Sequence, residues 1–499
     1  MNLWTVNLLK IKILESKCGV FRVYIFGVIL ILGSLLIGSV TTSLWMDDYP
    51  FFWGMVRDDP ATINFILGSG RPFLALFISL GGNFSLSLQL LSYLKIIGLL
   101  GIIFTYTTIT NRWHRLNFPK YSFLIAAIGL CLPTFQSYAF WASAFTYSWA
   151  PGLATLSLSM WGQGARTTKV FASLLFAISF LIYPPGALFI FGLIAAEFWI
   201  SELSIASMVR TIKNTCVLVL VGTTISLLII YGYVAAWNLD SNQRVELVKP
   251  DELLDKFSWF VTRVLVSSFR PFQISSPSPL EAFLSVVPTL LVFAFGLYKR
   301  FVFARQQYAI SIILLLFPLV MSSFHSLALR ENQFEFRFFP GQMWATFVIL
   351  TVIVVKFMLL KWDFFLAKAF TFLSTFFVFS FVIVKSNLVY FELIKNPFDI
   401  KTTFLINTIS NCKLLSSDRS LLFVVIPTKP KHLSNLGSYS IQLDSYYDWV
   451  IQPEVKLLDS FMAKPVSPQN DKGTFPSSYI CKIRVAAIEQ GINDAKSGN

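Results

Sequence analysis

Two adjacent carboxylates, Asp47 and Asp48, follow directly on a long apolar run from Val20 to Leu44. They stand where a membrane helix would meet water, and charge is costly there unless it is paired or solvated. A carboxylate in this place can act as a general base and take the proton from a sugar hydroxyl. We therefore predict that Asp47 and Asp48 are catalytic. The competing interpretations are a solvated loop start and a pair that helps to bind a divalent cation.

Arginines gather in the same segment and in one late loop. Arg57 and Arg71 follow the acid pair, and Arg330 and Arg337 lie in the polar stretch from His325 to Gly341. A guanidinium group suits phosphate because it makes charge-assisted, bidentate contacts. We predict that these four arginines bind a phosphate-bearing substrate. The alternatives are anchoring to lipid headgroups for the early pair and ion pairs within the loop for the late one.

Other kinds of reactive site are excluded by residue type and spacing. The chain has three histidines and five cysteines, and none of them form a pair with metal-ligand spacing. We therefore predict no metal centre built from histidine or cysteine, and no cofactor is certain. There is also no glycine-rich phosphate loop and no convincing Ser-His-Asp order.

Composition places the chain in a membrane. It has 499 residues, of which 55% are hydrophobic and only 13% charged, against about 25% charged in soluble domains. The net charge of +14 does not indicate nucleic-acid binding, because lysine and arginine collect in short loops between apolar runs. That distribution is the positive-inside pattern of a multi-pass protein whose partner is the lipid bilayer.

Apolar runs predict an all-α polytopic protein with about eleven transmembrane helices. Lys10, Lys12 and Lys17 precede the first run and Arg22 lies at its start, so we expect the N-terminus in the cytoplasm. An odd number of spans then puts the C-terminus outside. The apolar stretch Phe73 to Leu80 is too short to span and is expected to be interfacial or re-entrant. The sequence Tyr183 to Gly186, with two prolines and a glycine, predicts a break between two helices.

The stretch from Thr134 to Tyr147 is rich in aromatic residues. We expect it to be an external loop after the third span. Its rings would then stack on sugars, guide an isoprenoid chain, or form an ordinary interfacial belt.

The composition changes after Tyr390. Residues 391–499 have ordinary charge density, and the segments Ser420 to Ile426 and Tyr479 to Val485 have the pattern of strands. We predict a membrane domain over residues 1–390 and a small α/β domain over 391–499 on the outer face.

Four short motifs resemble one known family. They are Asp47-Asp48 after the first span, Gly70-Arg71-Pro72 at the end of the same loop, the break Leu181-Ile182-Tyr183-Pro184-Pro185, and the late segment Phe336-Arg337-Phe338-Phe339-Pro340. Together with the layout of spans they resemble polytopic glycosyltransferases of the GT-C class. More narrowly, they are similar to the bacterial glucosyltransferase-II family that modifies O-antigen.

The resemblance implies transfer of glucose from an undecaprenyl-phosphate carrier to a lipopolysaccharide O-antigen at the periplasmic face of the inner membrane. Asp47 or Asp48 would then activate the acceptor hydroxyl, Arg71 and Arg337 would hold the donor phosphate, and Tyr183 would lie in the substrate site. The sequence departs from the family pattern in one place. A basic residue is expected a few positions after the acid pair, but here Tyr49 to Phe52 intervene and the first basic residue is Arg57. The alternatives are a transporter or flippase of lipid-linked sugars and a glycan polymerase.

Overall fold

The structure is a computed structural model of the chain. It describes residues 3–41, 60–68, 70–81, 88–201, 204–237, 247–265, 279–302, 308–328, 339–356, 380–384, 386–388, 421–426 and 479–484. The predicted eleventh span falls largely outside this part of the chain.

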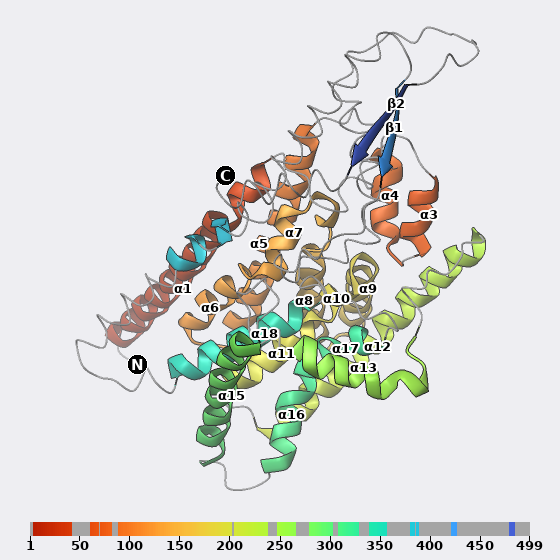
Figure 1. The fold of residues 1–499 in the computed structure, drawn as a ribbon. Coiled ribbons are helices and arrows are strands. Elements are labelled where there is room, and N and C mark those ends of the chain that lie inside the picture. The colour runs from red at the N-terminus through yellow and green to blue at the C-terminus, as the bar shows by residue number, and fades with distance from the viewer. Residues whose placement is uncertain are drawn as a thin grey trace.

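The described part of the chain is largely helical (Figure 1). Its N-terminal half contains α1 (Leu3–Val40), α3 (Pro60–Gly68), α4 (Pro72–Gly81), α5 (Leu88–Arg115), α6 (Lys120–Gly129), α7 (Pro133–Phe140), the 3-10 turn η1 (Ala142–Ala144), α8 (Trp149–Trp161), α9 (Arg166–Ile182), α10 (Pro184–Ala187), α11 (Phe189–Ile200) and α12 (Ile205–Ala236). Its C-terminal half contains η3 (Pro250–Glu252), α13 (Leu253–Trp259), the π-helical turn η4 (Phe260–Leu265), α15 (Pro279–Val302), α16 (Tyr308–Met321), α17 (Phe324–Ala328), α18 (Pro340–Val354) and the strands β1 (Leu421–Ile426) and β2 (Tyr479–Arg484).

Three described helices are long and apolar enough to cross a membrane. The spans are Val20–Val40 in α1, Ser92–Arg115 in α5 and Ile205–Ala236 in α12. The pair α6 and α7 makes a fourth if the two helices count as one span bent by 60°. These long apolar helices make the chain a multi-pass membrane protein.

Two predicted helix boundaries lie close to those in the structure. The first span is predicted over Val20 to Leu44 and covers Val20–Val40 in the structure. The predicted break at Tyr183 is confirmed, because α9 ends at Ile182 and α10 begins at Pro184. Tyr183 itself is extended (φ −161°, ψ 103°), as expected for a residue whose successor is proline.

The aromatic stretch Thr134 to Tyr147 was predicted as an external loop, and this is wrong. The structure forms α7 and η1 there, and the rings of Phe135, Tyr138 and Phe140 are completely or almost completely buried. Pro133 starts α7, because a proline at the first helical position loses no hydrogen bond. The rings face the protein interior, so the segment is not an interfacial belt.

Helix α5 also extends further than predicted. From the sequence we expect a second span over about Leu86 to Thr110, followed by a basic loop from Asn111 to Lys120, but the helix continues through Arg112 to Arg115. The guanidinium of Arg112 pairs with Glu197 of α11. Basic side chains in the last turn also suit the partial negative charge at a helix C-terminus.

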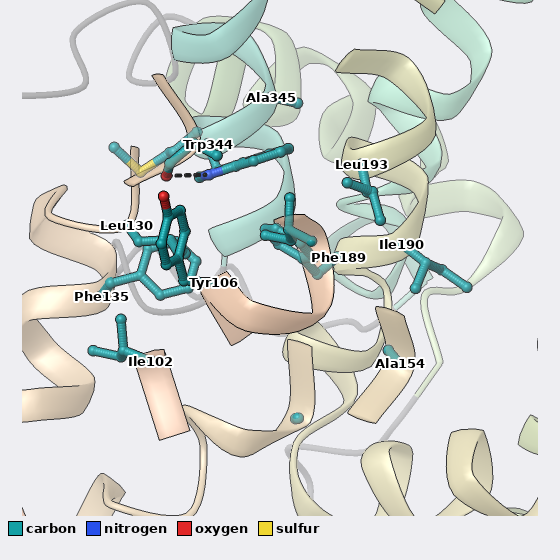
Figure 2. Close-up of a cluster of buried hydrophobic side chains, with 14 of the residues drawn as sticks. Ile102, Tyr106, Leu130, Phe135, Ala154, Phe189, Ile190, Leu193, Trp344 and Ala345 are labelled. Carbon is teal, nitrogen blue, oxygen red and sulfur yellow. Dashed lines mark hydrogen bonds between the residues drawn. The ribbon is translucent and has the colours of Figure 1, made fainter. Parts of the chain in front are cut away.

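The core joins helices from distant parts of the sequence (Figure 2). Trp344 of α18 packs on Phe189 of α11 at 4.9 Å between ring centroids and on Trp113 of α5 at 5.8 Å. Its indole Nε1 donates a hydrogen bond to the Ala126 carbonyl oxygen at 3.3 Å. Phe189 in turn meets the edge of Phe135 in α7.

Helices α11 and α18 approach closely because small residues face each other. A Cβ atom added at Gly192 would overlap the carbonyl group of Gly341. Small residues at helix crossings are typical of membrane bundles, where backbone proximity increases packing contact.

The two strands form a parallel pair. Leu421 lies opposite Tyr479 and Ile426 opposite Arg484. They occupy the segments for which the sequence pattern predicted strands. The rest of residues 391–499 lies outside the described residues, so the predicted α/β domain remains a prediction.

Candidate functional site

A turn between α3 and α4 presents Arg71. Gly70 has a φ of +73°, which glycine adopts without steric cost, and its amide donates to the Leu67 carbonyl oxygen at 2.8 Å. The amide of Arg71 donates to the Ile66 carbonyl oxygen at 3.2 Å. Helix α4 then begins at Pro72. The glycine ends one helix and the proline starts the next, so the position of Arg71 is fixed by its two neighbours.

This turn is also held against α12. The hydroxyl of Tyr233 donates to the Leu67 carbonyl oxygen at 3.0 Å, close to the point where α3 ends. The turn is thus fixed both by its own backbone and by a membrane-spanning helix.

The guanidinium group of Arg71 contacts Tyr147. Its Nη1 donates to the phenol oxygen at 2.8 Å, and its Cζ lies 5.5 Å from the centre of the ring. Among the described residues, no carboxylate pairs with Arg71. A half-buried cation with this neighbour is suited to an anionic ligand.

Tyr147 rests on a second tyrosine. Its ring stacks on Tyr183 with 4.1 Å between centroids and planes 5° apart. Tyr138 meets both rings edge-on, at 6.1 Å from Tyr147 and 5.9 Å from Tyr183. Tyr147 is only 3% exposed and Tyr183 1%, so the stack is part of the interior. We refer to Arg71, Tyr138, Tyr147 and Tyr183 as the arginine–tyrosine cluster.

Helices α8 and α9 position the stack. The Ser179 hydroxyl of α9 donates to the Ala150 carbonyl oxygen of α8 at 2.7 Å. A Cβ atom added at Gly186 would lie 2.8 Å from the Cβ atom of Ala150, so the turn after Tyr183 also approaches α8 closely. These contacts place the Tyr183 ring against the ring of Tyr147, which lies two residues before α8 begins at Trp149.

The cluster can bind an anion but cannot offer a free aromatic platform. A phenol is both a donor and an acceptor, so Tyr147 can accept from Arg71 and still donate its proton. The two residues together supply N–H and O–H donors, which suit phosphate oxygens. The ring of Tyr147 covers the ring of Tyr183. Tyr183 therefore supports Tyr147 and does not present a face to a sugar.

The structure thus joins two of the predicted site residues, Arg71 and Tyr183, through Tyr147. The other predicted residues lie outside the described part of the chain; they are Asp47, Asp48, Arg57, Arg330 and Arg337. Within the described residues, no group of three or more metal-ligating side chains occurs.

Sequence reasoning missed two charged sites with little exposure, Lys95 and the Arg112–Glu197 ion pair. Lys95 of α5 is 0% exposed, and its Nζ donates to the Thr41 carbonyl oxygen at 3.1 Å. Arg112 makes a bidentate ion pair with Glu197, with Nε–Oε1 at 2.6 Å and Nη2–Oε2 at 2.8 Å. The signal for Lys95 and for Glu197 was the same: a single charge in an otherwise apolar run.

The two charged groups mark opposite ends of α5. At a rise of 1.5 Å per residue, Lys95 and Arg112 are about 25 Å apart along the helix axis. The arginine–tyrosine cluster belongs to the Lys95 end, because Tyr138 packs its backbone against Gly98, one turn after Lys95.

A scan against protein-family models finds no match, and a search of curated proteins also finds none.

Proposed function

We propose that the protein is a membrane glycosyltransferase. It moves a sugar, glucose by the family resemblance, from a polyprenyl-phosphate carrier to a lipopolysaccharide O-antigen or a similar surface glycan. The reaction takes place at the periplasmic face of the bacterial inner membrane. The observation that carries the proposal is Arg71 seated on Tyr147 at the end of the segment that contains the acid pair.

In the proposed reaction, Asp47 or Asp48 takes the proton from the acceptor hydroxyl. The acceptor oxygen attacks the anomeric carbon of the donor sugar, and the bond from that carbon to the phosphate oxygen breaks. The polyprenyl phosphate leaves with the electron pair of that bond. Positive charge near the departing phosphate stabilises the transition state, where negative charge develops.

Arg71 is the described residue best suited to the phosphate. Its planar group donates in pairs, and Tyr147 fixes its orientation while leaving most of its N–H groups for a ligand. Arg57, Arg330 and Arg337 are proposed as further phosphate ligands on the strength of residue type and sequence position.

The competing classes are a transporter or flippase and a glycan polymerase. Transporters tend to have internal repeats and polar sites near the membrane midplane. Here the sequence has no convincing repeat, and the ionisable residues of the predicted site come from segments outside the apolar runs. A polymerase with a similar topology would be favoured by a large late external loop, and the stretch His325 to Gly341 is short.

The test is the glycan composition of lipopolysaccharide from a strain that lacks the gene. The strain is complemented with wild type, Asp47→Asn, Asp48→Asn or the control Asp255→Asn, which changes an exposed acid on α13. We expect one side-branch hexose to disappear without the gene and with at least one of the first two variants. Chain length should stay the same, and the control should restore the branch.

Two results would contradict the proposal. An unchanged glycan in the deletion strain would show that no sugar of the glycan depends on this protein, and collapsed chain length would favour the polymerase. Membrane content of each variant is measured by immunoblot, so that loss of protein is not mistaken for loss of activity.

A further inference from the structure

Lys95 is a charged residue buried in a membrane-spanning helix. It lies in the span Ser92–Arg115 and is 0% exposed. An apolar residue would be cheaper there, because desolvating an ammonium group is costly and replacing a buried charge by an apolar side chain is often neutral or stabilising. A charge kept at such a position is by default a candidate functional group.

Lys95 holds the C-terminal end of α1. Its Nζ donates to the Thr41 carbonyl oxygen at 3.1 Å, and Ser92, one turn earlier on α5, donates to the Val40 carbonyl oxygen at the same distance. The carbonyl groups at a helix C-terminus are without intrahelical partners and carry partial negative charge, so an ammonium group stabilises them.

Helix α7 completes the junction. The Ser39 hydroxyl donates to the Ala139 carbonyl oxygen at 3.3 Å, and the ring of Phe140 fills the space beside Gly38. The last residues of α1 are therefore fixed by α5 on one side and by α7 on the other.

The same junction adjoins the arginine–tyrosine cluster. A Cβ atom at Gly98, one turn after Lys95, would lie 2.6 Å from the Tyr138 carbonyl oxygen. The Tyr138 ring in turn contacts both Tyr147 and Tyr183. Lys95 thus belongs to the helix segment that supports the predicted phosphate site.

We propose that Lys95 is a positioning residue for sugar transfer: it fixes the point from which the chain runs to Asp47 and Asp48, beside the arginine–tyrosine cluster. Asp47 lies only six positions after Thr41, so an extended chain reaches at most about 20 Å from that point. This proposal rests on the proposed glycosyltransferase function.

The test compares purified Lys95→Met, Lys95→Arg and wild type in nanodiscs with a polyprenyl-phosphate glucose donor. Misplacing a reacting group by about 1 Å costs about 100-fold in rate, so we expect kcat of Lys95→Met to fall by roughly that factor. The KM for the donor should change less than about threefold, since donor binding is not removed. Lys95→Arg should regain at least about tenfold of the lost kcat, because it restores the charge.

The matched control is Lys169→Met, which removes an exposed lysine that lies 5.6 Å from the ring of Trp161. It should keep wild-type kcat. The proposal is overturned if Lys95→Met keeps kcat within about threefold of wild type, or if its effect is confined to KM. Where Lys95→Met does not accumulate, Lys95→Gln takes its place, because it keeps a donor and loses the charge.

A second readout is independent of activity. Met46→Cys is labelled with a membrane-impermeant maleimide in the Lys95, Lys95→Met and Lys169→Met backgrounds, with the signal of the native cysteines subtracted. We expect faster labelling only with Lys95→Met, because the segment loses its fixed origin. Equal rates would overturn the positioning role, whereas a wild-type protein that transfers no sugar would overturn the proposed function alone.

Discussion

At the scale of single residues, Arg71 is the described group best suited to the proposed contact with a phosphate. Its contact with Tyr147 holds the guanidinium in one orientation, and no described carboxylate neutralises it. A planar cation held in this way is preorganised for phosphate, so little reorganisation is needed when negative charge develops.

Substitutions of Arg71 and Tyr147 should show separately how the charge of the guanidinium group and its orientation contribute to kcat/KM. We expect Arg71→Gln to lower kcat/KM for the lipid donor by about 100-fold, because a donor aimed at developing charge is lost. Tyr147→Phe keeps the charge of Arg71 and removes the hydroxyl group that accepts its hydrogen bond, so kcat/KM should fall by about tenfold. The control Arg166→Gln, at an exposed arginine at the start of α9, should retain wild-type kcat/KM.

The Arg112–Glu197 ion pair predicts a different effect, on stability. Trp113 Nε1 also donates to Glu197, at 3.2 Å, so this carboxylate has two partners. Breaking a buried pair from one side costs about 3–5 kcal/mol because an unpaired charge remains. We therefore expect Glu197→Leu to lower the free energy of unfolding by about that amount in detergent.

The double variant Arg112→Leu/Glu197→Leu should recover much of this loss, since it leaves no buried charge. Unfolding followed by intrinsic fluorescence in a denaturant series measures both effects. A single variant as stable as wild type would show that the pair contributes nothing.

Residue types predicted the arginine–tyrosine cluster only in part. Arg71 and Tyr183 were singled out by guanidinium chemistry and by the double proline. Tyr147 was seen only as a member of an aromatic stretch, because nothing in sequence spacing shows that residues 71, 147 and 183 meet. That proximity depends on the packing of α8 against α9.

At the scale of helices, close contact depends on glycine. Gly192 of α11 and Gly341 of α18 let two backbones meet, and a Cβ atom at Gly192 would overlap the Gly341 carbonyl group. Gly232 of α12 has no atom within 4 Å of the same hypothetical Cβ position, so it offers a matched comparison.

We expect Gly192→Ala to lower the free energy of unfolding by about 1–3 kcal/mol, the usual cost of overpacking. Gly232→Ala should leave stability unchanged or raise it by about 0.5–1 kcal/mol, because alanine is the better helix former. Thermal unfolding in the same detergent checks both. Equal melting temperatures for the two variants would contradict the close crossing of α11 and α18.

Helix predictions succeeded where apolar length or proline determined the result. The first span and the break at Tyr183 are examples. They failed at Thr134 to Tyr147, because polar and aromatic residues look like a loop until tertiary packing buries them. They also failed at Arg112, which is helical although the apolar run ends before it; its guanidinium pairs with Glu197, 85 residues further along the chain.

At the scale of the whole molecule, α5 separates two ends with different chemistry. The arginine–tyrosine cluster and Lys95 lie at one end, and the Arg112–Glu197 pair lies at the other, about 25 Å along the helix axis. This distance is close to the thickness of the hydrocarbon layer, about 30 Å. The charge pattern of the sequence predicts that the Arg112 end faces the cytoplasm.

Cysteine labelling tests this orientation. Ser79 on α4 and Gln163 between α8 and α9 are both exposed. With a membrane-impermeant maleimide and a permeabilised outer membrane, we expect Ser79→Cys to react and Gln163→Cys to react only after the inner membrane is lysed. The reverse pattern would invert the proposed topology.

We propose that the acid pair and the arginine–tyrosine cluster together transfer sugar from a lipid phosphate. The most direct test is transfer by the purified protein in nanodiscs, with polyprenyl-phosphate [14C]glucose and lipopolysaccharide acceptor. We predict that wild type labels the acceptor, and that Arg71→Gln and either Asp47→Asn or Asp48→Asn lower the rate by at least about 100-fold. Absence of transfer by wild type, or full activity in both aspartate variants, would contradict the proposed sugar transfer.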